Sequence, residues 1–364
     1  MILFFLILLL ICILLDRKVS PGIYDYEDAT FPWSTSPSSY LSPMNSTFGT
    51  YNVLLDGHAH TTESDGKLKP GQVVEWARAH GYNAIVVSDH NDASGGLKAQ
   101  AYAKERYNDF VVIPGQEYSC CRIHMNFLNL NTTIKPTSPW PSDAELKRVV
   151  DQVHSLGGLV VVNHVAWSNH TTAPFQEATL PDHPSREALL ALGVDGIEVV
   201  NGNTFDMRSW SLQQQHPNSL FSITGSDLHT PDGAYAWTIL NAPNLTVEGI
   251  LGELRAHRSS FLLDAGGTRP RVYPDFTGAW KAFSPLSALS DLASLFYSEE
   301  KGMYSFQGSF CQPKQVEVHG GIIGYALLYF ALLVGLYEVS RLFFLWAFQL
   351  ALARLKGAFP SRAG

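Results

Sequence analysis

Short apolar runs alternate with helical patterns along the middle of this chain, and this alternation restricts the fold more than any other feature of the sequence. Runs rich in β-branched residues predict seven strands, at 51–55, 84–87, 110–113, 125–130, 159–162, 196–200 and 220–224. Helices are predicted between them at 70–80, 97–107, 142–156, 185–192 and 247–257. Near-continuous apolar strands are typical of a sheet covered on both faces. Alternating strands and helices favour a mostly parallel sheet, and this many units favours closure into a barrel.

Residues that can bind metal ions occur at the ends of successive predicted strands. His58 and His60 follow the first strand, where an i, i+2 pair projects to one side of an extended segment. In a barrel the carboxyl ends of the strands lie on one face, so we expect the candidates to converge on one rim. The nine candidates are His58, His60, Asp65, His90, Glu117, His124, His164, Asp227 and His229.

The residue types in this set predict the kind of metal. A single histidine is usually an ordinary hydrogen-bonded residue, but nine candidates at strand ends indicate one metal site. Imidazole and carboxylate together suit zinc, manganese or iron, whereas calcium and magnesium prefer oxygen ligands. Because such ions take about four to six ligands each, the set predicts two or three divalent ions, with zinc favoured.

The same residues, in this order, resemble the polymerase and histidinol phosphatase family, abbreviated PHP. The resemblance covers about residues 51–265, and it rests on His58-x-His60 with Ser64-Asp65-Gly66, then Asp89-His90, Glu117, His124, His164 and Asp227-x-His229. It implies an α/β fold, a distorted seven-stranded (β/α)7 barrel similar to a TIM barrel. It also implies a centre of two or three metals that hydrolyses phosphoesters. The apolar segments predicted to flank this barrel at the membrane have no counterpart in the family.

By position, the resemblance implies a division of the ligands among three ions. The first ion would be held by His58, His60, Glu117 and Asp227, the second by Asp65 and His90 with Glu117 bridging, and the third by His124, His164 and His229. Gly66 allows the loop after Asp65 to bend back, so that Asp65 faces a different ion from the histidine pair.

The expected activity is hydrolysis of a phosphoester by hydroxide formed on the metals. The ions would lower the pKa of a shared water and neutralise the phosphate oxygens. Asp227 is the candidate for handling the proton. Arg122 is the candidate for clamping a phosphate oxygen in a forked contact, and His170 for protonating the leaving oxygen.

Other functions remain open on the sequence alone. The chain could be a phosphomonoesterase acting on a soluble nucleotide or small metabolite, or a metal-binding membrane scaffold without catalysis. Amide hydrolysis on a related barrel is a third alternative. Such sites usually need a carboxylated lysine at a strand end, whereas Lys67 and Lys69 lie in the loop after Asp65.

Apolar segments at both ends predict attachment to a membrane. Residues 1–18 are predicted to be a signal anchor or signal peptide, and an anchor is favoured because no small-residue cleavage site follows. Residues 320–354 are predicted to form a transmembrane or interfacial helix, and 355–364 a basic cytosolic tail. The chain between them is predicted to comprise a linker, the barrel and a juxtamembrane extension, at 19–50, 51–265 and 266–319.

This topology predicts a membrane of the secretory pathway or the cell surface, with the catalytic domain in the lumen or outside the cell. Glycosylation patterns at 45–47, 131–133, 169–171 and 244–246 agree with a glycoprotein on that side. Arg17 and Lys18 on the lumenal side count against it. Cys120 and Cys121, with Cys311, allow either a disulfide in an oxidising lumen or buried free thiols.

The expected substrate is a phosphoester carried by a membrane lipid, such as a phospholipid head group or a glycolipid-anchor phosphodiester. Tethering to the bilayer raises the effective concentration of such a substrate. The net charge of −8 supplies no polycation for a phosphate backbone, so no nucleic-acid partner is expected. The sequence does not predict an oligomeric state.

Overall fold

The computed structural model describes residues 24–168, 180, 182–268, 272, 275–276, 295–300, 305–306, 308, 311 and 315–358. The chain divides into two compact units, which we describe separately. The larger comprises Pro21–Lys281 and Lys301–Lys314, and the smaller comprises Met1–Ser20, Ala282–Glu300 and Gln315–Gly364. The predicted signal segment at 1–18 and the candidate acid His170 lie outside the described residues.

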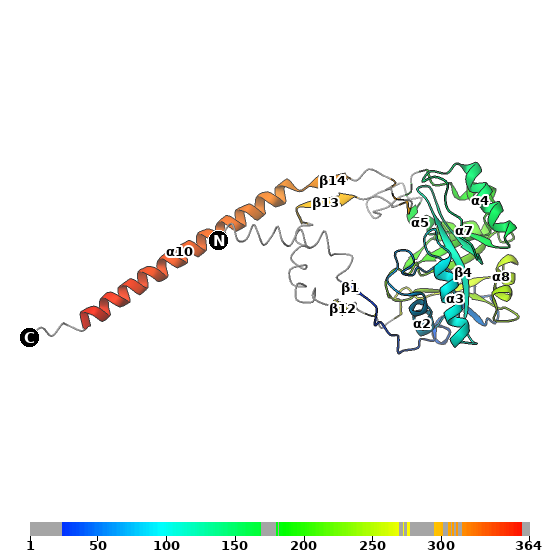
Figure 1. Ribbon diagram of the computed structural model, residues 1–364, viewed down its shortest axis with the longest axis horizontal. Helices are drawn as coiled ribbons and strands as arrows, with labels where there is room; N and C mark the ends of the chain where they lie inside the picture. Colours follow the sequence, from blue (N-terminus) through cyan, green and yellow to red (C-terminus); the bar gives the residue numbers. More distant parts are fainter. Residues whose placement is uncertain are drawn as a thin grey trace, which may run out of the picture. The chain divides into compact units, whose positions relative to one another are not determined.

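A ten-stranded mixed sheet forms the centre of the larger unit and curls into a half-barrel (Figure 1). The strand β9 (Phe221–Gly225) pairs with β7 off the main path. The main path runs in the order β11 (Ser260–Leu263), β10 (Ala236–Leu240), β2 (Val53–Asp56), β3 (Ala84–Val87), β4 (Val111–Ser119), β5 (His124–Leu128), β6 (Leu159–Val162), β7 (Gly196–Asn201) and β8 (Thr204–Phe205).

All seven predicted strands are present, as β2 to β7 and β9, but the sheet is not a regular ring of seven βα units. The β4–β5 and β5–β6 pairs are antiparallel, because a short turn rather than a helix joins β4 to β5. In addition, β10 and β11 extend the sheet beyond β2 and were not predicted. Their apolar runs resemble the other strands, but no candidate metal ligand follows them.

The segments that leave the strands at the carboxyl-end rim are joined to one another. Gly57 N donates to Thr224 O at 2.8 Å, which connects the chain after β2 to β9. Ala59 then forms a parallel bridge with Leu228. His90 and Glu117 form a similar bridge beyond β3 and β4. Most of the predicted ligands lie on or beside these joined segments, and His124 and His164 lie at β5 and after β6.

Helices pack on the outside of the curled sheet (Figure 1). Helix α4 begins as predicted, because Ser142 N donates to the Glu145 carboxylate at 2.7 Å while Glu145 N donates to Ser142 Oγ. Helix α7 was not predicted, and it begins at Asp206, whose Oδ1 caps two backbone N–H groups. The bounds are η1 (Pro37–Ser39), α2 (Pro70–Ala79), α3 (Ser94–Arg106), α4 (Asp143–Ser155), α5 (Val165–Ser168), α6 (Arg186–Leu192), α7 (Met207–Gln215) and α8 (Val247–Arg255).

Buried apolar side chains hold the strands in place between the rim and the helices. Trp76, Tyr118, Phe127 and Trp237 are among the largest side chains that are fully buried. Burying an aliphatic or aromatic side chain of this kind contributes about 1.5–3 kcal/mol. The strands that carry the rim are therefore fixed by a packed apolar core. A two-residue strand pair, β1 (Tyr24–Asp25) with β12 (Asp275–Phe276), completes the described strands of this unit.

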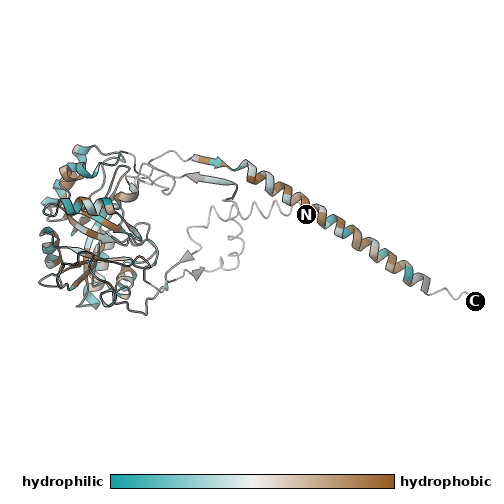
Figure 2. Cartoon of the chain, turned by 180° about the vertical axis from the view of Figure 1, so that it is seen from behind, coloured by the Kyte–Doolittle hydropathy of each residue, from teal (hydrophilic) through white to brown (hydrophobic). Residues whose placement is uncertain are grey.

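The described part of the smaller unit consists of a hairpin and one long helix. Strand β13 (Tyr297–Glu300) pairs with β14 (Gln315–Val318), and α10 (Gly320–Ala358) follows. Figure 2, coloured by hydropathy, shows mostly hydrophobic residues along α10. By length and composition, Gly320–Leu355 could cross a membrane, and an 18-residue stretch within it has a mean hydropathy of 1.9. The helix continues through Glu338 and Arg341, whose side chains pair at 2.7 Å.

Candidate metal centre

The nine predicted ligands come from distant parts of the sequence and meet at the rim. The structure brings these side chains together, and their role as metal ligands stays a prediction. Asp227 and His164 contact members of three groups whose potential ligand atoms lie within 4.8 Å of one another. The groups are His60 with Asp65, His90 and His229; His58 with His60 and Glu117; and His90 with Glu117 and His124.

Glu117, at the end of β4, is the centre of this arrangement and is fully buried. Its Oε1 lies 3.2 Å from His124 Nδ1, 3.1 Å from His164 Nε2 and 3.6 Å from His58 Nε2. Its Oε2 lies 2.7 Å from His90 Nδ1. A carboxylate whose two oxygens face different histidines fits the role of a bridging ligand.

The histidine pair after β2 converges on Asp227. His58 Nε2 and His60 Nε2 lie 3.0 Å apart, and Asp227 Oδ1 lies 3.4 Å from the first and 3.1 Å from the second. Metal–nitrogen and metal–oxygen bonds of about 2.0–2.2 Å place neighbouring ligand atoms roughly 3.0–3.6 Å apart. The spacing of these three atoms therefore fits a metal ion.

Asp65 belongs to a second group on the same rim. Its Oδ1 lies 3.6 Å from His90 Nε2 and 3.2 Å from His229 Nε2. Gly66 is needed for this bend, because a Cβ atom there would lie 2.7 Å from the carbonyl carbon of His60. Asp65 and His58 thus fall in different groups, which is the arrangement expected from the loop.

His229 is the one ligand that the structure places differently from the assignment by position. That assignment put His229 with His124 and His164, whereas its Nε2 faces Asp65 and its Nδ1 lies 3.5 Å from Asp227 Oδ1. The reason is topological, since the segment after β9 runs beside the segment after β2. His124 begins β5 and His164 follows β6, and both face Glu117.

In two histidines, His58 and His229, a hydrogen bond at Nδ1 leaves Nε2 facing the rim. His58 Nδ1 lies 3.2 Å from Glu198 Oε1, and His229 Nδ1 lies 2.9 Å from the carbonyl oxygen of Asp227. These acceptors assign the proton to Nδ1 in both rings. Each Nε2 then faces a carboxylate, and that charge is met either by a proton on Nε2, in the metal-free chain, or by a cation that replaces the proton. The residues present therefore fit divalent ions.

Buried carboxylates dominate the electrostatics of the rim. Burial lowers the pKa of His58, but the carboxylates of Asp227, Glu117 and Glu198 outweigh burial and raise that pKa to about 10. Burial raises the pKa of Glu117, but the histidines around it, led by His124, bring it well below its ordinary value. The carboxylates are therefore ionised at neutral pH, and the rim attracts cations.

Two acidic residues position the ligands and were not among the predicted ligands. Glu198 on β7 contacts His58, and its Oε2 also accepts from His164 N at 2.7 Å. Asp89 accepts from Thr61 N at 2.7 Å and from Ser64 Oγ at 2.6 Å, which holds the loop that carries Asp65. A lone carboxylate inside the apolar run 196–200 was the available signal for Glu198.

The backbone at the rim is strained at three non-glycine residues. Asp227 has a φ of 52°, His164 of 31° and Asn91 of 51°. Such left-handed conformations cost free energy and persist where the surroundings over-determine them. Each of the three lies at the end of a strand beside or among the predicted ligands.

Arg122, the predicted phosphate clamp, contacts the segment that leads into α4. The guanidinium of Arg122 donates to the carbonyl oxygens of Asp182 at 3.1 Å and Pro141 at 2.8 Å, and it pairs with Asp143 at 2.8 Å. These contacts tie the β4–β5 turn to the start of α4 and leave the phosphate clamp a prediction. His170 lies outside the described residues.

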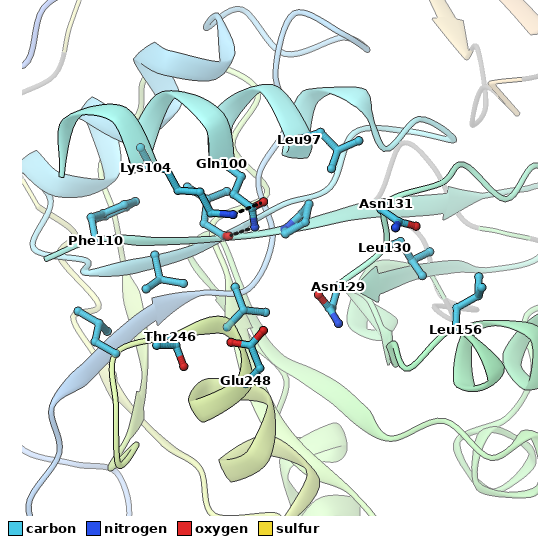
Figure 3. Close-up of a pocket in the computed structure, with 16 residues that line it drawn as sticks. Leu97, Gln100, Lys104, Phe110, Asn129, Leu130, Asn131, Leu156, Thr246 and Glu248 are labelled. Atoms are coloured by element: carbon cyan, nitrogen blue, oxygen red, sulfur yellow. Dashed lines mark hydrogen bonds between the residues drawn. The ribbon is translucent and has the colours of Figure 1, made fainter. Parts of the chain in front are cut away.

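Two cavities differ in their relation to the rim. A groove of about 330 Å³ adjoins the ligands and includes Asp227 and His229 in its wall. A larger cavity of about 560 Å³ lies at the opposite end of β4, between α3 and the start of α8, where Lys104 donates to Gln100 (Figure 3). Among the described residues that line the larger cavity, none is a predicted ligand. The smaller groove is therefore the candidate substrate site.

Comparisons with known proteins give partial likenesses. No protein-family model matches the sequence. An uncharacterized protein of Methanocaldococcus jannaschii is 35% identical over 72 residues, which cover 18% of this chain. The match spans about a third of that relative's length, 33%.

Solved structures also resemble this chain in part. One is a two-domain protein of Bacteroides vulgatus containing a predicted PHP-like metal-dependent phosphoesterase, with 20% identity, a TM-score of 0.47 and coverage of 68% of this chain and 71% of that one. Another is an amidohydrolase of Chromobacterium violaceum solved with sulfate and no metal, with 18% identity, a TM-score of 0.39 and coverage of 58% and 98%. At these levels the chemistry of this chain has to be inferred from its own residues.

The metal-free protein is expected to lose stability as the pH rises from about 6.5 toward 10. The pKa of His58 is raised from 6.5 to about 10, so its protonated form stabilises the fold fully below pH 6.5, and this contribution disappears through pH 10. Metal-loaded protein should not show this loss, because ligand histidines bind metal in the neutral form. Melting temperatures measured with chelator and with zinc test this, and parallel declines in both would contradict it.

Asp65→Ala is expected to remove about one metal ion per chain and to leave the ion held by His58 and His60, because the two groups use different carboxylates. Mass spectrometric metal analysis of the purified chain checks this. Asp151→Ala is the matched control, since Asp151 pairs with Lys147 on an exposed helix face. An unchanged metal content, or loss of every ion, would contradict the division into groups.

Proposed function

We propose that this chain is a membrane-anchored, metal-dependent phosphoesterase of the PHP type that holds two or three divalent ions, with zinc favoured over manganese or iron. The observation that supports this most is the convergence of nine imidazole and carboxylate side chains, with the buried Glu117 at their centre. A shared carboxylate between groups of histidines is what a multinuclear hydrolytic centre requires. On this proposal the curled sheet works as a distorted seven-stranded barrel, with its ligands at the carboxyl ends.

When bound, such ions would activate a water and neutralise the oxygens of a phosphate. The residues of the chain have separate tasks around them. Asp227 faces the histidine pair and lies in the wall of the groove, with its side chain 18% exposed. Neighbouring histidines, led by His58, outweigh burial and hold its pKa well below the ordinary value. It is therefore ionised at neutral pH, and its place in the wall of the groove, not its pKa, makes it the candidate for handling the proton of an attacking water.

The groove beside Asp227 is proposed to hold the leaving group. Among the described residues that line it, none is Lys or Arg, while Asn203, Thr230, Asp232 and Tyr235 offer polar atoms. The negative charge of the phosphate would therefore be neutralised by the ions at the rim. The groove would bind the uncharged, hydroxyl-bearing part of the substrate. His170 and Arg122 stay candidates for the acid and the clamp from sequence alone.

The proposed substrate is a phosphoester carried by a lipid. The support is α10, which is long and apolar enough to anchor the chain and thus to raise the local concentration of membrane-borne substrates. Three features support a lumenal or extracellular catalytic domain. They are the exposed side chains of Asn45, Asn131 and Asn244 in glycosylation patterns, the disulfide between Cys121 and Cys311, and the basic tail at 355–364.

Removing a shared ligand tests the proposed activity. Glu117→Ala and His58→Ala are each expected to lower phosphoester hydrolysis by a factor on the order of 10² or more, because the paired groups lose their common centre. His154→Ala is the matched control, since His154 pairs with Asp195 on the surface at 2.8 Å. The assay uses an aryl phosphoester with added zinc or manganese. Full activity in both rim variants would contradict catalysis at this site and would favour the non-catalytic scaffold.

The class of ester is tested by comparing two substrates on the wild-type chain. A bis-aryl phosphate is expected to be hydrolysed faster than an aryl monophosphate, because a lipid head-group ester or glycolipid-anchor linkage is a diester. Turnover of phospholipid vesicles should follow the diester result. If only the monoester is hydrolysed, the lipid proposal fails, and a soluble nucleotide or small metabolite becomes the favoured substrate.

A further inference from the structure

An aromatic side chain from the far end of the larger unit stacks on one of the predicted ligands. The ring centroids of Phe306 and His90 lie 3.5 Å apart, and the ring planes differ by 17°. The ring of His60 also stacks on His90, at 4.3 Å and 29°. Two rings cannot occupy the same face of an imidazole at these distances. His90 is therefore held between His60 on one face and Phe306 on the other.

The edges of the His90 ring are held by residues of the barrel. Its Nδ1 lies 2.6 Å from Ser119 Oγ and 2.7 Å from Glu117 Oε2, and its Nε2 faces Asp65. Phe306, which lies outside the predicted barrel at 51–265, covers one face of the His90 ring. As a result His90 is only 6% exposed, whereas the side chain of Asp65 is 40% exposed.

The backbone of Phe306 indicates that its position is imposed by its surroundings. Its φ of 56° lies in the left-handed region, where a bulky residue is uncommon. A conformation of this kind costs free energy and persists where contacts over-determine it. The preceding residue, Ser305, is fully buried, so the chain enters the stack from a packed position.

A disulfide fixes this segment at the turn that supports His90. Cys311, five residues after Phe306, is bonded to Cys121 across 190 residues of sequence, with a Cα–Cα distance of 5.3 Å. Cys121 is two residues after Ser119, which contacts His90. A covalent tie lowers the entropy cost of bringing distant segments together. It therefore favours the position of Phe306 over the rim.

We propose that Phe306 is a positioning residue for His90, and that the Cys121–Cys311 disulfide holds it there. The segment beyond the predicted barrel then completes the metal centre by fixing the plane of one ligand. It also closes the His90 side of the rim, while Asp65 and His229 remain open beside the groove. This inference rests on the proposed function for its metal, but the contact with His90 can be tested without metal.

The first experiment measures metal release from the full chain in detergent. Zinc-loaded protein is mixed with a chromophoric zinc chelator, and the release rate is followed by absorbance. Phe306→Ala is expected to release zinc faster by a factor on the order of tenfold, the scale seen when a group that orients a metal ligand is removed. Phe306→Tyr keeps the ring and should release zinc at nearly the wild-type rate.

Phe205→Ala is the matched control, because Phe205 is a partly buried ring that packs on the core away from the ligands. It should leave zinc release unchanged. If Phe306→Ala behaves like Phe205→Ala, or if Phe306→Tyr fails to restore slow release, the positioning role is wrong. Melting temperatures of all variants identify a general loss of folding.

The second experiment needs no metal. Metal-stripped chains are treated with diethyl pyrocarbonate, and modification of His90 is measured by peptide mass spectrometry. Phe306→Ala should increase the rate of His90 modification several-fold, while the modification of His154 on the surface stays constant. If the wild-type chain binds no zinc but Phe306→Ala still increases His90 modification, the proposed function is refuted and the stack is supported. A chain that binds zinc without the increase would refute the stack alone.

The disulfide is tested by the double variant Cys121→Ser/Cys311→Ser. It is expected to raise His90 modification in the same direction as Phe306→Ala. Adding Phe306→Ala to the double variant should have little further effect, because both changes remove the same contact between Phe306 and His90. Effects of the disulfide and the ring that simply add would contradict the claim that the disulfide acts through Phe306.

Discussion

A buried, ionised carboxylate surrounded by imidazoles is the constraint on which the rest of this structure depends. Removing Glu117 from water is costly unless its charge is met by partners. The chain meets it with histidines from the ends of β2, β3, β5 and β6. Bringing these segments to one point requires the curled sheet, the bridges beyond the strand ends and the strained backbone at Asp227 and His164.

Local signals in the sequence predicted much of this arrangement. The apolar runs gave strands in the right places because a buried strand needs a continuous apolar segment. His58-x-His60 and the loop with Asp65 and Gly66 were also readable, since two histidines at i, i+2 share a face and glycine permits a tight bend. Helix α10 follows from a long apolar stretch.

The features that were missed are those set by contacts between distant segments. No local pattern shows that β4 and β5 form a hairpin, or that the segment after β9 runs beside β2 and carries His229 to Asp65. Glu198 is visible as a charge in an apolar strand, but its partner His58 lies 140 residues away. Phe306 gives no signal in the sequence at all, because its contact with His90 depends on the packing of the whole unit.

Three parts of the chain contribute to the proposed function: the rim of predicted metal ligands, the disulfide-held segment that covers His90, and the apolar helix α10 that could anchor the chain. The rim is the part on which the other two depend, so its metal content is the most direct test. Metal analysis of the purified full chain by mass spectrometry should find two or three zinc, manganese or iron ions per chain. A chain that binds none of these ions after incubation with each would contradict the central claim.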